Sequence, residues 1–365
     1  MRSQQRQTKS RSATTGAKIC VALLACAAGF AQAQSSVTIY GTLDVGLTHI
    51  NNVAGLSTTK LDDAIGSPSV LGFKGVEDLG GGLSAFFVLE NRFMVDTGTS
   101  FPQLFNRGSF VGLKSSTWGT LTLGRQFDFF STALPIDAKP FIEGGSISGY
   151  QGFRGATPAL NPAVDVHDGT GQYDNSVKWE HTIGPFSGGL MYGLGAELPG
   201  QKMESAYLKY VAGPLQLGAG WTKDNFSTAI ANQVYSVRGV YVVNDFTLLA
   251  NYSEGKETVV AGSKAVARPL ELAVNYQCTG NMTCGGGVGS ARDTNRAGNR
   301  ATLTQPFMSV RYNLSKRTQL YAVAAYNHSN NPSVIPSSFG VPGGVAGISS
   351  NASESALRLG ITHRF

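Results

Sequence analysis

The sequence predicts an all-β protein, an antiparallel transmembrane β-barrel that follows an export signal. Most stretches between turns alternate apolar and polar side chains with a period of two. That pattern is typical of a strand with one face to lipid and the other to a polar interior. Charged residues make up only 14% of the chain, against about 25% in ordinary soluble proteins. After residue 33, no apolar run reaches the roughly 20 residues that a membrane-spanning helix needs.

Residues 1–33 contain the three parts of a secretory signal peptide in the required order. A basic stretch runs to Lys18, an apolar run covers 19–30, and Ala31-Gln32-Ala33 offers a cleavage site of small residues. A buried N-terminal helix is the alternative, and the order of the three parts disfavours it. We therefore expect a signal peptide over 1–33 and a barrel domain over 34–365.

The signal peptide also accounts for most of the positive charge. The chain has 29 Lys and Arg against 23 Asp and Glu, a formal net charge of +6. Five of the basic residues and none of the acidic ones lie in 1–33, which leaves 24 against 23. A nearly neutral mature chain gives no reason to expect a nucleic-acid partner.

Fifteen segments of the mature chain are predicted to be strands. They cover 37–50, 69–77, 83–93, 105–113, 119–126, 173–181, 187–194, 203–211, 215–223, 233–243, 246–254, 267–277, 301–312, 317–328 and 355–365. In the first, Val37, Ile39 and Leu47 share one face. In the last, Leu357, Leu359 and Ile361 face away from Arg358 and Thr362.

Bacterial barrels have an even number of strands, so a sixteenth is expected. We place it in 285–299, where glycine is dense and the alternation is weak. Sixteen strands leave about 21 residues for each strand and its connector, which suits transmembrane strands of about 9–11 residues. An eight-stranded barrel would leave too much loop.

The connectors differ in length in the way a membrane barrel requires. Short turns are predicted at 77–82, 115–118, 183–186, 212–214, 243–245 and 313–317, and longer segments at 127–172, 277–300 and 329–353. Short turns at one end and long loops at the other are typical of outer-membrane barrels. A soluble β-sandwich is the alternative. Tyrosines near strand ends favour the barrel, because they would form an interfacial girdle: Tyr210, Tyr241, Tyr252, Tyr276, Tyr312 and Tyr326.

Two cysteines remain after export, Cys278 and Cys284 in CTGNMTC. A small disulfide loop is favoured in an exported protein, and a metal half-site is the alternative. The five histidines are scattered without metal-ligand spacing, and no nucleotide-binding or hydrolase motif occurs. We therefore predict no catalytic residue, cofactor or metal.

Several segments resemble the general porins of beta-proteobacterial, Gram-negative outer membranes. They are SSVTIYGTLDVGL (35–47), LGFKGVEDLGGGLSAFFVLEN (71–91), LFNRGSFVGLKSSTWGTLTLGRQ (104–126), LSKRTQLYA (314–322) and ALRLGITHRF (356–365). The resemblance implies a sixteen-stranded homotrimer with a water-filled channel for ions and small hydrophilic solutes. It also implies a third extracellular loop folded into the lumen as a constriction. The chain departs from the pattern at 277–300.

The resemblance places the inward loop within 127–172, where its acidic side chains would face a ladder of basic ones. The candidate acids are Asp137, Glu143, Asp165 and Asp168. Alternation puts the candidate bases Lys74, Arg92 and Arg107 on the lumen side, with Arg125 next to the loop. Each of these could instead be a solvated wall residue. Arg125 has the parity of lipid-facing Leu123, so we expect a bulge or the strand end to redirect it. We also expect a weak preference for anions.

The resemblance further implies partners in the membrane. These are outer-membrane lipid and lipopolysaccharide, and the barrel-assembly machinery, which would bind the C-terminal strand that ends in Phe365. A substrate-specific channel is the main alternative function. An outer-membrane lipase and a loop-mediated adhesin or phage receptor are further alternatives.

Overall fold

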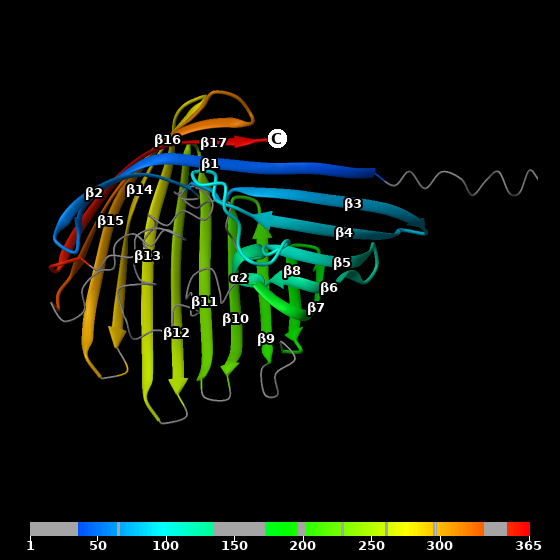
Figure 1. Ribbon diagram of the computed structural model, residues 1–365. Coiled ribbons are helices and arrows are strands. Elements are labelled where there is room, and N and C mark those ends of the chain that lie inside the picture. The colour runs from blue at the N-terminus through cyan, green and yellow to red at the C-terminus, as the bar shows by residue number, and fades with distance from the viewer. Residues whose placement is uncertain are drawn as a thin grey trace, which may run out of the picture.

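A single closed β-sheet forms the computed structural model of the protein (Figure 1), which describes residues 36–63, 66–134, 172–195, 202–227, 230–259, 262–294, 296, 298–331 and 349–365. Its strands are β1 (Ser36–Val53), β2 (Leu56–Asp63), β3 (Val70–Gly80), β4 (Leu83–Arg92), β5 (Gly108–Ser115), β6 (Gly119–Phe127), β7 (Gln172–Ile183), β8 (Phe186–Gly193), β9 (Met203–Ala212), β10 (Leu215–Ser227), β11 (Ile230–Val243), β12 (Phe246–Val259), β13 (Lys264–Thr279), β14 (Met282–Thr294), β15 (Arg300–Asn313), β16 (Thr318–Ser329) and β17 (Ser353–Arg364). One short helix, α2 (Phe129–Thr132), follows β6. Among the described residues, no helix is long and apolar enough to cross a membrane.

The seventeen labelled strands make a sixteen-stranded barrel, because β2 and β3 are two halves of one strand. Both pair antiparallel with β1, β2 with its second half and β3 with its first. The pairing stops at Val45 with Asp63 and resumes at Thr42 with Val70, so the chain between these two pairs, of which 66–69 are described, is an insertion within the strand. The predicted sixteen-stranded antiparallel barrel is confirmed.

Two predicted boundaries are wrong. Residues 56–63 lie between the predicted strands 37–50 and 69–77, where no strand is predicted, yet they form β2. The segment 277–300 was predicted as a long connector with a strand in 285–299, yet β13 and β14 meet in a tight turn and β14 spans Met282–Thr294. Alternation is weak in β14 because glycines replace side chains on its inner face. A Cβ on Gly287 would lie 2.6 Å from the Phe307 ring, which fills that space.

The two faces of the sheet have opposite character. Large apolar side chains are exposed on the outer face, for example Leu47, Leu190 and Leu272. On the inner face, Thr48, Ser253 and other polar residues alternate with them. Tyrosines cluster on the outer face toward the end with the short turns (Tyr210, Tyr241, Tyr276 and Tyr312) and toward the end with the long loops (Tyr192, Tyr235, Tyr252 and Tyr326). This is the arrangement of an apolar belt between two aromatic girdles.

The barrel closes where the last strand meets the first. β17 pairs with β1 from Thr42–Arg364 to Ile50–Ala356. The final residue continues this pairing, because Phe365 and Gly41 each donate their backbone N–H to the other's carbonyl at 3.1 Å. A Cβ on Gly41 would lie 2.5 Å from Cζ of Phe365 and 2.5 Å from the Val70 carbonyl oxygen. Glycine is therefore required where three strands meet.

Candidate functional site

Two of the predicted basic residues lie together on the inner wall formed by β1, β3, β4 and the start of β5. The Tyr40 hydroxyl donates to Glu90 at 2.8 Å, and the Lys74 ammonium lies 5.0 Å from the centre of the Tyr40 ring. Arg107 Nε is 3.4 Å from the Glu90 carboxylate. Lys74 and Arg107 therefore flank one carboxylate and one aromatic ring, and we call this group the basic wall.

Arg92 continues this wall toward the long loops. Its guanidinium lies 5.6 Å from the centre of the Phe101 ring. Its backbone N–H donates to Asn106 Oδ1, and Asn106 returns a bond to the Arg92 carbonyl. The segment after β4 is thereby tied to the strand end that carries the arginine.

Arg125 has different neighbours. Its guanidinium lies 2.6 Å from Asp174 and donates from Nε to the Asn106 carbonyl at 2.7 Å. The β6–β7 register shifts beside it, and Asn175 has a φ of 51°. The extra residue is in β7, opposite Arg125, and not in β6, where a bulge would redirect the arginine itself. It brings a carboxylate to the arginine, which neutralises the charge at the loop end of the strand.

The predicted acidic loop residues Asp137, Glu143, Asp165 and Asp168 lie outside the described residues. The beginning of that loop is described, and polar contacts hold it against the inner wall. Asp128 caps α2 by accepting from the Phe130 N–H, and it also accepts from the Thr222 hydroxyl at 3.0 Å. Arg238 donates to the Phe130 carbonyl at 3.2 Å, and Lys178 to the Thr132 hydroxyl at 2.9 Å.

Apolar contacts hold the same segment. Phe129 and Phe130 are fully buried. Phe129 packs on Tyr207 of β9 with the ring centres 4.5 Å apart, and Phe130 packs with Val234 of β11. The chain after β6 therefore turns inward onto the wall (Figure 1), since these partners lie on the lumen side of their strands. Sequence reasoning missed these anchors, because a pair of phenylalanines in a loop has no periodicity to mark it.

A second group of charged and polar side chains is fully buried midway along β1. The sequence did not reveal that these residues come together. The Arg358 guanidinium lies 3.3 Å from Asp44 and is also paired with Asp62. It donates to the Tyr321 hydroxyl at 2.7 Å and to Thr48 Oγ1 at 2.8 Å. The insertion after β2 covers the group, because the Gly66 N–H donates to Asp44 at 3.0 Å. We call this group the buried Arg358 cluster.

A disulfide joins Cys278 and Cys284 across the β13–β14 turn, with the Cα atoms 6.0 Å apart. Within the described part of the chain, no three metal-binding side chains come together. The inner wall instead presents fixed charges beside a polar surface. Such an arrangement acts on passing ions through its field, which is stronger than in bulk water where hydration is incomplete.

Comparisons with known proteins agree with this geometry. Residues 20–332 match the family model described as Gram-negative porin. The chain is 30% identical to outer membrane porin protein 32 of Delftia acidovorans, over 95% of this chain and 99% of that protein. It is 26% identical to an outer membrane porin of Bordetella pertussis, again over 95% of this chain and 99% of the other.

Solved structures show the same fold. The anion-selective porin from Comamonas acidovorans superposes with a TM-score of 0.76 at 24% identity, covering 91% of this chain and all of the other. A trimer form of OmpT from Vibrio cholerae superposes with a TM-score of 0.69 at 15% identity, covering 91% of this chain and 99% of the other. These relatives are channels rather than enzymes. The chain belongs to the Gram-negative porin family and forms a porin channel of the outer membrane.

Proposed function

We propose that the channel is a passive, general diffusion pathway with a weak preference for anions and no catalytic role. The observation that supports the anion preference is the exposure of the charged side chains in the lumen to water. Lys74 and Lys114 are exposed on the inner wall. By contrast, Glu257, Glu271 and Glu354 are only 0–2% exposed.

Two partly exposed acids of the inner wall are paired with a base. Glu90 lies beside Arg107, and Glu180 lies 3.7 Å from Lys178. At the basic wall Arg107 balances Glu90 and Lys74 adds an exposed positive charge, so the field there attracts anions. The structural relative from Comamonas acidovorans is an anion-selective porin, and the preference proposed for this chain follows from its own exposed charges.

The general character of the pathway is supported by the rest of the inner wall. Neutral hydroxyl groups that water reaches lie on this wall beside the lysines, for example Thr38, Ser84 and Thr120. Such groups hydrate many solutes without the geometry that would recognise one of them. A substrate-specific channel is the alternative.

The assembly and export of the protein are part of the same proposal. We propose a homotrimer, supported by the trimer form of one structural relative. Residues 1–33 are removed on export, and the C-terminal strand ending in Phe365 is bound by the barrel-assembly machinery. The outer face then contacts outer-membrane lipid and lipopolysaccharide.

Single-channel recording in planar bilayers tests these statements. We expect conductance in triplet steps, a reversal potential in a KCl gradient with the sign of chloride preference, and no saturable block by any one sugar or amino acid. Single steps would contradict the trimer, and cation preference would contradict the charge argument. Saturable block by one solute would instead support the substrate-specific channel.

A further inference from the structure

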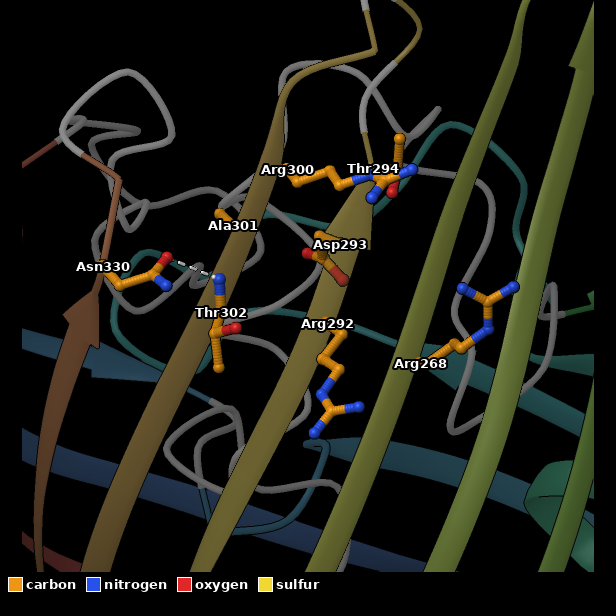
Figure 2. A pocket seen from close by; sticks show the side chains of 8 residues that line it. All are labelled: Arg268, Arg292, Asp293, Thr294, Arg300, Ala301, Thr302 and Asn330. Carbon is orange, nitrogen blue, oxygen red and sulfur yellow. Dashed lines mark hydrogen bonds between the residues drawn. The ribbon is translucent and has the colours of Figure 1, made fainter.

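A pocket of about 380 Å³ lies at the loop ends of β13, β14 and β15 (Figure 2). Three arginines line it, Arg268, Arg292 and Arg300, together with Asp293, Thr302 and Asn330. None of these residues belongs to the basic wall or to the buried Arg358 cluster.

Alternation places the first two arginines on the outer face of the barrel. On β13, Arg268 has the same parity as Leu270 and Leu272, which are 46% and 51% exposed. Arg292 lies directly opposite Arg268 in the β13–β14 register and is exposed as well. Asp293 lies on the other face, since its partners Ala267 and Ala301 are both buried.

The arrangement leaves an excess of positive charge beside the apolar belt. Side chains directly opposite one another in an antiparallel pair have Cβ atoms about 4.5–5.5 Å apart, and like charges there repel. One carboxylate is close, because Glu254 lies 2.6 Å from Arg268 Nε. Among the described residues, no carboxylate forms an ion pair with Arg292. Arg300, opposite Thr294 at the start of β15, adds a third positive charge to the lining.

We infer that this pocket binds a phosphate group of lipid A, the phosphorylated glycolipid anchor of lipopolysaccharide, in the outer leaflet. A guanidinium presents parallel N–H donors that match phosphate oxygens, so a phosphate between Arg268 and Arg292 relieves their repulsion. The exposed leucines of β13 continue directly below the arginines, where the acyl chains of the same lipid would lie. Thr302 and Asn330 are neutral hydrogen-bonding groups at the edge of the pocket.

The position selects a lipid over a soluble phosphate. The arginines face the membrane side of the sheet, at the boundary where the apolar belt ends, and a soluble anion in the lumen would not reach them. This inference deepens the proposed contact with lipopolysaccharide and rests on it.

The test uses the full mature chain, folded in detergent, and native mass spectrometry with purified lipid A as the probe. We expect diphosphoryl lipid A to bind and R268Q/R292Q to weaken that binding at least about tenfold, because each lost charge-assisted bond contributes that much. R268K/R292K should bind with intermediate affinity, because it keeps the charge and loses the paired donors. The matched control is K202Q/K223Q, which removes two positive charges from the same end of β9 and β10.

Equal binding of lipid A by wild type and R268Q/R292Q would overturn the inference. So would equal binding of dephosphorylated lipid A, or competition by millimolar inorganic phosphate that abolishes lipid binding. Heat-dependent mobility on gels confirms that each variant is folded. Conductance is recorded in parallel: an unchanged channel with lost lipid binding supports the site, whereas a silent channel in the wild type would contradict the proposed function instead.

Discussion

Replacing Arg358 by methionine tests the buried Arg358 cluster, which ties β1 and β2 to β16 and β17. Methionine has a similar length and no charge, so the substitution leaves Asp44 and Asp62 buried without their cation. Both carboxylates keep some partners. Asp44 still accepts from Tyr321 at 2.9 Å, and Asp62 still lies 3.3 Å from Lys60.

Removing one member of a buried ion pair costs about 3–5 kcal/mol. Because Lys60 compensates in part, we expect R358M to lower the free energy of unfolding by about 3 kcal/mol, the lower end of that range. The control is R317M, in the exposed β16 turn, for which we expect a change of at most about 0.5 kcal/mol.

The assay is urea-induced unfolding in detergent micelles or lipid vesicles, followed by tryptophan fluorescence. The double variant R358M/D62N should recover part of the loss, with a coupling energy of about 1–3 kcal/mol. A loss below about 1 kcal/mol for R358M, or strictly additive effects in the double variant, would refute the electrostatic reasoning.

Three further perturbations test the fold. G41V should prevent efficient closure, because its side chain would collide with Phe365 and the β3 backbone; normal yields of heat-resistant folded protein would contradict this. L272R places a charge on the lipid-facing wall and should cost about 2–4 kcal/mol in vesicles, whereas L272M should be nearly neutral; equal stability of the two would argue against a lipid-facing position. C278S/C284S opens a very short loop, so the urea midpoint should fall by the equivalent of at most about 2 kcal/mol, with conductance unchanged; a non-conducting variant would assign the disulfide a larger role.

Strand positions could be predicted because side-chain alternation is a local property. Segments such as 203–211 and 246–254 are strands in the structure, as β9 (Met203–Ala212) and β12 (Phe246–Val259). Alternation failed where inward side chains are missing or where the chain leaves the sheet. In β14, glycines leave the inner face without side chains, so no alternation is visible in the sequence. The insertion after β2 contains glycine, serine and proline, which are also typical of an ordinary loop between two strands.

The pore lining was predictable only in part, for a related reason. Parity indicated that Lys74 and Arg107 face the lumen, but their shared contact with Glu90 depends on register between strands. The buried Arg358 cluster depends on contacts across almost the whole chain: Asp44 and Arg358 are 314 residues apart. The carboxylate that meets Arg125 is brought there by a one-residue bulge, which no local pattern reveals.

The most direct test of the channel account is the reversal potential of the full chain across a planar bilayer in a KCl gradient. The wild type should favour chloride over potassium. K74Q/R107Q should move the reversal potential toward potassium, because it removes two basic lumen side chains and leaves Glu90 without the Arg107 charge. R268Q/R292Q, on the outer face, should leave it unchanged. Cation preference in the wild type, or an identical reversal potential in K74Q/R107Q, would contradict the claim that the basic wall sets the selectivity of the channel.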